Sequence, residues 1–283
     1  MPHLLCFGLG YSARALAARV AADGLQVAGT SRSPGDAVPY VCHRFGREHP
    51  LPVSAFAEIT HILLSVPPDA DGDPVLDRHR GDIAALPGLR WLGYLSTTGV
   101  YGDRDGGWVD ETSELRPSGE RGRRRVAAEA GWLDLWRQRG VPVHVFRLAA
   151  IYGPGRSPFD TLRAGTAKRI DKAGQVFSRI HVEDLASVLL ASIARPRPGA
   201  VYNVCDDEPA PPGDVVAHAA ALLGLPAPPL VSFDEAELSP MAKSFYDDNK
   251  RVSNVLIKTE LGVMLRYPDY RAGLAAILAA ERR

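Results

Sequence analysis

The stretch that decides the fold reads Leu4-Leu5-Cys6-Phe7-Gly8-Leu9-Gly10-Tyr11-Ser12-Ala13. Its first four residues form a short apolar run, which is typical of a buried strand, and the Ala-rich residues 13–22 are typical of a helix, ended by Gly24. Two glycines between these runs favour a tight turn. The stretch therefore predicts a strand, a turn and a helix in immediate succession.

The glycine turn has the spacing GxGxxA, which suits a pyrophosphate. Gly8 permits the tight turn, Gly10 lets the backbone approach the anion, and Ala13 lets the helix pack closely on the strand. The first turn of the helix, with Tyr11 and Ser12, adds free N–H groups and the positive end of the helix dipole. We therefore expect a dinucleotide site here. The alternative is a glycine turn without a ligand.

The end of the second predicted strand, residues 25–29, bears on the choice of dinucleotide. Sites for NAD place an acidic residue there, on the ribose hydroxyls. This chain instead has Thr30, Ser31 and Arg32. Arg32 and the two hydroxyls can hold a 2′-phosphate by charge-assisted hydrogen bonds, which predicts NADP, with NAD as the other possibility. The alternative for Arg32 is a solvated surface arginine.

Further short apolar runs at residues 59–66, 91–96 and 143–148 alternate with helical patterns, of which residues 126–139 are the longest. Strands that alternate with helices predict an α/β fold with a doubly wound parallel sheet, the Rossmann fold. Ser65, Val66 and Ser96 end two of these strands. We expect them to line the cofactor site.

The C-terminal third is punctuated by prolines at 209–212 and 226–229 and carries short helical patterns such as 214–223. We expect a small C-terminal lobe on the substrate side, formed by residues 151–175 and 205–283. Residues 1–150 and about 176–204 then form the NADP-binding domain.

Composition limits the classes of partner. Lys and Arg balance Asp and Glu at 33 each, which argues against a nucleic-acid partner. No apolar run is long enough for a membrane span and no signal peptide is apparent, so we expect no membrane partner and a cytoplasmic location. The three cysteines lack CxxC spacing and the eight histidines lack HxH or HExxH spacing. We expect reduced thiols and no metal.

Several more segments occur together in a recognisable order: LSTTGVYG at 95–102, VDE at 109–111, RLAAIYGPG at 147–155, HVEDL at 181–185 and VYNV at 201–204. Over nearly the whole chain this resembles the extended short-chain dehydrogenase/reductase superfamily, which includes sugar-nucleotide epimerases and dehydratases. DNKRVSN at 248–254 and ELG at 260–262 resemble its atypical subgroup, the NAD-dependent epimerase/dehydratase-like proteins.

The resemblance implies catalytic positions. A hydroxyl residue after the fourth-strand region matches Thr97, which would orient a substrate carbonyl or alcohol. The family's YxxxK pair falls at Arg121 and Arg125, and arginine cannot act as an acid or base at physiological pH. These arginines are either a solvated helix start or contacts to an anionic substrate. Tyr101 is the nearest phenol in the sequence, and replaces the missing one only if it faces the cleft.

Other residues are expected to be structural. Asp184 is predicted to cap a helix over 185–193, His181 precedes that helix, and Arg147 is predicted to fix the loop at 153–155 through its carbonyls. Asn203 is expected to be structural too. The resemblance also implies a homodimer formed through the helix at 126–136.

Two functions follow. The first is an NADP-dependent oxidoreductase or epimerase that acts on the hydroxyl or carbonyl group of a small or nucleotide-linked molecule, with Thr97 orienting that substrate. The second is a non-catalytic NADP-binding redox sensor or regulatory protein. General acid–base help is typically worth about 10²–10⁴-fold in rate, so an enzyme needs a substitute for the missing tyrosine.

Overall fold

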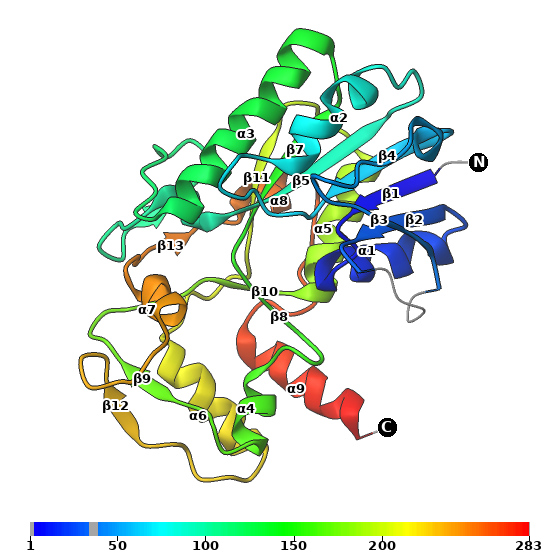
Figure 1. Ribbon diagram of the computed structural model, residues 1–283. Coiled ribbons are helices and arrows are strands. Elements are labelled where there is room, and N and C mark those ends of the chain that lie inside the picture. The colour runs from blue at the N-terminus through cyan, green and yellow to red at the C-terminus, as the bar shows by residue number, and fades with distance from the viewer. Residues whose placement is uncertain (1–2, 34–38, 283) are drawn as a thin grey trace.

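A seven-stranded parallel sheet forms the centre of the computed structural model, which describes residues 3–33 and 39–282 (Figure 1). In the order β11-β7-β5-β4-β1-β2-β3 the strands are Val201–Val204, Val143–Leu148, Trp91–Thr97, Ile59–Leu64, His3–Phe7, Gln26–Ser31 and Val41–Arg44. The chain proceeds outward from β1 to β2 and β3, then returns to β4 on the other side of β1. Ligands of such sheets bind at this reversal, outside the carboxyl ends of the strands.

This sheet confirms the predicted doubly wound fold. The pattern missed β3, an edge strand whose four residues are all exposed or half-buried. Because it buries no apolar run, it lacked the signal that marked its neighbours.

Helices cover both faces of the sheet (Figure 1). One core joins β1 to α1 (Tyr11–Ala22), α5 (Val182–Ala194) and α8 (Val255–Thr259). The other joins the opposite face to α2 (Pro74–Ala84), α3 (Glu120–Arg139) and the short 3₁₀ helix η1 (Val53–Phe56). Alternate residues of β1 serve the two cores, with Leu4 and Cys6 in the first and Leu5 and Phe7 in the second.

A smaller lobe packs below the carboxyl edge of the sheet (Figure 1). Its core is formed by α4 (Pro158–Arg163), α6 (Pro212–Leu222) and α9 (Tyr270–Glu281). Beside them lie β9 (Arg169–Asp171), β12 (Leu230–Ser232) and α7 (Pro240–Tyr246). Two short parallel pairs link lobe and sheet: β8 (Ala150–Tyr152) with β10 (Arg179–His181), and β6 (Trp108–Val109) with β13 (Arg251–Val252).

The expected lobe boundary differs from the packing in one segment. Ile257, Leu261 and Val263 lie in the core on the α1 face of the sheet, although we expected residues 205–283 to belong to the lobe. The chain therefore returns to the sheet domain before it forms α9.

The start of α5 corrects the cap prediction. The helix begins at Val182, and the cap is His181, whose Nδ1 accepts a hydrogen bond from Glu183 N at 3.2 Å. The carboxylate of Asp184 instead accepts hydrogen bonds from the backbone N–H groups of Arg266 and Tyr267, at 2.8 and 2.9 Å. Asp184 thus ties the C-terminal segment to the sheet domain.

The apolar positions of α3 pack inside the chain. Leu135 is 1% exposed, Leu133 and Trp136 pack against the same core, and Val126 packs against a cluster with Val100 and Tyr101. The homodimer through this helix stays a prediction. Within residues 3–33 and 39–282, no helix is long and apolar enough to cross a membrane.

The cysteines are free thiols in this fold. Cys6 and Cys205 are buried and Cys42 is half-buried. Burial raises the pKa of Cys6 to about 12, so this thiol stays protonated at neutral pH.

Candidate functional site: a two-part cleft at the carboxyl edge of the sheet

The glycine turn lies between β1 and α1 and has the geometry that a pyrophosphate needs. Gly8 has a φ of +84°, and its N–H donates to Oγ1 of Thr30 at 2.9 Å. Gly10 precedes the first turn of α1, where no side chain caps the free N–H groups. A Cβ added at Gly10 would meet no atom within 4 Å, so the backbone is open to the cleft there. The turn therefore fits the phosphates of a dinucleotide.

A cavity of 730 Å³, here called the Gly8 cavity, opens beside this turn. Seven of the residues predicted to bind the cofactor line it: Gly8, Gly10, Thr30, Ser31, Arg32, Ser65 and Val66. Arg32 is exposed at its edge, at the end of β2. Arg14 also lines this cavity and was missed, because it follows the turn by one helical step rather than the second strand.

Ala13 has the packing role predicted for it. It is 0% exposed and belongs to the core between α1 and the sheet, so it does not line the cavity.

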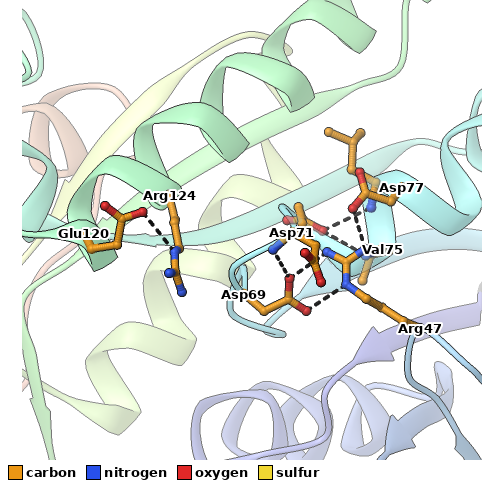
Figure 2. A network of polar contacts seen from close by, with 9 residues as sticks. Arg47, Asp69, Asp71, Val75, Asp77, Glu120 and Arg124 are labelled. Atoms are coloured by element: carbon orange, nitrogen blue, oxygen red, sulfur yellow. Dashed lines mark hydrogen bonds and ion pairs between the residues drawn. The ribbon is translucent and has the colours of Figure 1, made fainter.

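Arg47 and Asp69, which line the Gly8 cavity, belong to an arginine clamp whose contacts Figure 2 shows. The guanidinium of Arg47 forms two hydrogen bonds with the carboxylate of Asp69, at 2.7 and 2.8 Å, and one with Asp77 at 2.7 Å. The bonds raise the pKa of Arg47, and they lower that of Asp69. The clamp fixes the loop between β4 and α2, so the acidic group in this cavity is already paired.

A second cavity of 460 Å³, here called the Thr97 cavity, adjoins the first, and Ser65 lines both. Tyr11, Ser12, Ser96 and Thr97 line it as well. Oγ1 of Thr97 accepts a hydrogen bond from Gly99 N at 3.1 Å, at the start of the 3₁₀ helix η2 (Thr98–Tyr101). The hydroxyl hydrogen of Thr97 has no acceptor in the part of the chain that the structure describes, so it can donate to a substrate oxygen.

The arginine cluster at the start of α3 divides into two pairs. Arg123 and Arg124 donate hydrogen bonds to the carboxylate of Glu120 on the helix surface. The bond from Arg124 is 3.2 Å long (Figure 2). Arg121 and Arg125 line the Thr97 cavity. The cluster is therefore part solvated surface and part cavity wall.

The two cavity arginines differ in the hydrogen bonds that their guanidinium groups make. Arg125 donates to the carbonyl oxygen of Leu95 at 2.5 Å and to the hydroxyl of Tyr94 at 3.1 Å. Arg121 is exposed and lies over the ring of Phe245, 5.8 Å from its centre, with no hydrogen bond or ion pair to a described residue. Arg121 is thus the one available to meet a ligand.

The helix reaches the cavity because of Gly122. A Cβ at this position would lie 2.7 Å from Cβ of Pro117 and 3.0 Å from the carbonyl oxygen of Gly99. Only a glycine lets the first turn of α3 approach η2 this closely.

A buried polar network supports the floor of the Thr97 cavity. The carboxylate of Glu129 pairs with the guanidinium of Arg147 at 2.8 Å and accepts from Oγ of Ser96 at 2.5 Å. Arg147 also donates to the hydroxyl of Tyr101 at 2.9 Å, which in turn donates to Oδ1 of Asn203 at 2.7 Å. The network binds α3 to β5, β7 and β11.

Two expectations are corrected by this network. Arg147 does not hold the loop at 153–155; it neutralises Glu129, a partner that sequence spacing did not indicate. Tyr101 is 0% exposed, and both bonds of its hydroxyl lie inside the network. It does not face the cleft, so it is no replacement for the missing phenol.

Three further residues line the Thr97 cavity and were not singled out: Arg156, Asp248 and Lys250. Lys250 pairs with Asp248, Nζ to Oδ2, at 2.9 Å. The motif around these two residues was noted only as a family signature, because nothing in the sequence brings residue 250 beside residue 97.

Comparison with known proteins defines the class. Residues 83–205 match the model of the NAD dependent epimerase/dehydratase family. The MoeE5 structure in complex with UDP-glucuronic acid and NAD superposes with a TM-score of 0.81, at 21% identity over 99% of each chain. Residues 83–205 thus have the sequence pattern of that family, and the chain has the fold of the MoeE5 structure.

Two other proteins are more similar to this chain in sequence. A functionally unknown conserved protein from Silicibacter pomeroyi DSS is 55% identical over 99% of each chain, with a TM-score of 0.92. Protein YeeZ of Escherichia coli (strain K12) is 33% identical over 180 residues, 62% of this chain. The match spans 58% of the length of YeeZ.

Proposed function

We propose that this protein is an NADP(H)-dependent oxidoreductase or epimerase that acts on a hydroxyl or carbonyl group of a small or nucleotide-linked, anionic substrate. One observation carries the proposal: the Gly8 cavity and the Thr97 cavity meet at Ser65. A dinucleotide laid along the glycine turn then extends toward Thr97, with open space for a substrate beside it. Open space at that point favours an enzyme over a sensor.

The preference for NADP rests on charge at the end of β2. Ser31 and Arg32 line the Gly8 cavity there, and the one carboxylate in that cavity, on Asp69, is paired with Arg47 among the described residues. Among the residues that the structure describes, which leave out 34–38, a 2′-phosphate thus meets a cation and no free anion, and the ribose hydroxyls of NAD meet no acidic acceptor.

The anionic character of the substrate rests on the Thr97 cavity. Its described lining holds four cationic side chains, Arg121, Arg125, Arg156 and Lys250, and one carboxylate, Asp248. Such a surplus attracts a phosphate or carboxylate group, and the exposed guanidinium of Arg121 can bind it in a bidentate manner.

The chain's own residues then have separate tasks. The nicotinamide, when bound, supplies or removes a hydride. Thr97 donates a hydrogen bond to the substrate oxygen and so orients it, and Arg121 holds the anionic end. Arg125, fixed on Leu95 and Tyr94, shapes the wall between them.

Nucleotide titrations by thermal shift test the proposal. NADPH at 100 times its Kd should raise the free energy of unfolding by about 2.7 kcal/mol, and NADH should stabilise less. The Gly10→Asp variant should still fold, because Asp is favoured at a helix N-cap. It should lose stabilisation by both nucleotides, because its carboxylate repels a pyrophosphate. Arg32→Glu should remove the preference for NADPH.

The matched control is Arg19→Glu, a charge reversal on the exposed part of α1 away from both cavities, which should change neither titration. No shift with either nucleotide would refute the proposal. Binding of NADPH without turnover of any anionic aldehyde, ketone or alcohol would favour the redox sensor instead.

A further inference from the structure

Lys250 and Asp248 lie in the segment between α7 and β13, and both line the Thr97 cavity. Their side chains are 10% and 19% exposed. Oδ2 of Asp248 accepts from Nζ of Lys250 at 2.9 Å, while Oδ1 is buried without a hydrogen-bond partner in the described chain. The Lys250 ammonium and the Asp248 carboxylate thus form an ion pair at the cavity wall. Oδ1 of Asp248 is left to accept a hydrogen bond from a polar group of a bound ligand.

The backbone between them is held from two sides. Asn249 accepts from Arg104 N through its carbonyl oxygen at 2.9 Å, and its own N–H donates to Oδ1 of Asp103 at 2.7 Å. Its side-chain oxygen accepts from Val176 N at 3.1 Å. Lys250 is therefore presented from a fixed segment rather than from a free loop.

The other ionisable groups at the cavity are poorly suited to exchange a proton with a substrate. Arginines stay protonated at physiological pH. Tyr11 lies next to Gly10 on the first turn of α1, and its hydroxyl donates to the carbonyl oxygen of Pro154 at 3.0 Å. Among the described lining residues, Lys250 remains as a donor that can release its proton and be restored.

We propose that Lys250, held by Asp248, is the proton donor and acceptor of the Thr97 cavity, in place of the tyrosine that the family resemblance expects at Arg121. The proposal rests on the proposed function and adds the residue that function lacks.

Lys250 would serve both directions of the reaction. In reduction, a hydride from a reduced nicotinamide dinucleotide adds to the substrate carbonyl carbon, the C=O π electrons move to oxygen, and that oxygen takes a proton from the Lys250 ammonium. The products are the alcohol, the oxidised dinucleotide and a neutral Lys250 amine, which solvent protonates again. In oxidation the neutral amine accepts the hydroxyl proton.

The surroundings of Lys250 suit this cycle. Burial lowers the pKa of its ammonium below the ordinary value of 10.5, and the charge of Arg104 adds to this effect. The carboxylates of Asp248 and Asp103 act in the opposite direction and keep the ammonium bound in place. A lysine with a lowered pKa is the stronger acid when protonated, and is more often neutral near pH 7 than an exposed lysine.

The first test measures the lysine without any substrate. The chain has few lysines, namely Lys168, Lys172, Lys243, Lys250 and Lys258, so each Cε resonance of ¹³C-lysine protein can be assigned by single Lys→Arg variants. In a pH titration by NMR, Lys250 should titrate below the other four, and Asp248→Asn should lower its midpoint further. A midpoint of Lys250 at or above the others would overturn the proposal.

The second test measures turnover of NADPH with a panel of phosphorylated and carboxylated aldehydes and ketones. Lys250→Met and Lys250→Arg should both lower kcat by at least about 100-fold, with nucleotide binding unchanged. Methionine has no proton to give, and arginine does not release its proton at physiological pH. In the parent, kcat/KM for reduction should fall as the pH rises through the Lys250 midpoint found by NMR. Lys243→Arg, on exposed α7, is the control and should keep parental rates.

The outcomes separate the two proposals. If Lys250→Arg keeps parental kcat, or if Tyr11→Phe loses it instead, Lys250 is not the proton donor although the protein is an enzyme. If the parent fails to bind NADPH or turns over no substrate of the panel, the proposed function itself fails, and the role of Lys250 with it.

Discussion

In the Gly8 cavity the ligand would meet mainly backbone, the free N–H groups before α1 and the open face of Gly10. In the Thr97 cavity it would meet side chains from distant segments, Thr97 at the end of β5, Arg121 on α3 and Lys250 before β13. Backbone recognition follows from a strand, a turn and a helix adjacent in sequence. Side-chain recognition depends on tertiary packing, so it varies with individual residues while the fold stays the same.

The largest effect should come from the support beneath the Thr97 cavity. Glu129→Leu leaves the Arg147 guanidinium buried at 5% exposure without its partner, which typically costs about 3–5 kcal/mol. The double variant Glu129→Leu, Arg147→Leu should recover much of this loss. Urea denaturation measures both.

The exposed pair on the same helix provides the control. Asp134 and Arg137 are 49% and 56% exposed, and Asp134→Leu should change stability by less than about 1 kcal/mol. Equal losses at Asp134 and Glu129 would contradict the role given to the buried pair.

The next effect on stability concerns the amino ends of the strands, away from both cavities. His144 is 0% exposed, its Nε2 accepts from Arg197 N at 2.8 Å, and burial lowers its pKa to about 4. Because the folded state binds its proton less readily than the unfolded state, stability should fall as pH drops from about 6.5 to 4, by roughly 3 kcal/mol for this group.

Denaturation at several pH values checks this. His144→Gln should be less stable at pH 7 but should show a shallower loss toward pH 4, whereas His49→Gln, on an exposed loop residue, should keep the parental slope. An unchanged slope in His144→Gln would mean that this histidine is not the source of the acid sensitivity.

A third prediction separates the two glycines of the turn. Gly8→Ala should cost about 1–2 kcal/mol, because φ is +84° and the new Cβ would lie 3.1 Å from a methyl carbon of Val66. Gly10→Ser should keep stability, since serine is a favoured N-cap, yet weaken NADPH binding at least about tenfold by filling the open face. Thermal melts with and without NADPH measure both, and a stable Gly8→Ala protein would contradict the strain argument.

The smallest effect on stability is expected at the clamp. Arg47→Gln breaks partly exposed ion pairs and should cost about 1 kcal/mol or less. NADPH binding should weaken more than stability, because the loop at 65–72 would have to be ordered on binding. Arg124→Gln, which breaks a surface pair of similar kind, is the control for calorimetric titration. Equal effects of both variants on NADPH affinity would remove the clamp from the site.

The contrast between a site built by neighbours in the chain and one built by distant segments also explains which features the sequence predicted. The strand, turn and helix over residues 4–22 were predicted closely, because each depends on neighbours in the chain. His181 was missed as the cap of α5, since Asp is the commoner cap and only the structure shows Asp184 occupied by the N–H groups of Arg266 and Tyr267. Lys250 was missed because the other residues of its cavity come from distant segments and join it only on folding.

The Glu129–Arg147 pair also bears on which positions of α3 can change while the helix keeps its place. It anchors α3 one turn beyond Arg125 and independently of whatever occupies the first turn of the helix. Arg121 makes no hydrogen bond or ion pair to a described residue, so position 121 can change without displacing the helix. A substitution at this position can therefore alter what the Thr97 cavity binds at no cost to the packing that shapes the cavity.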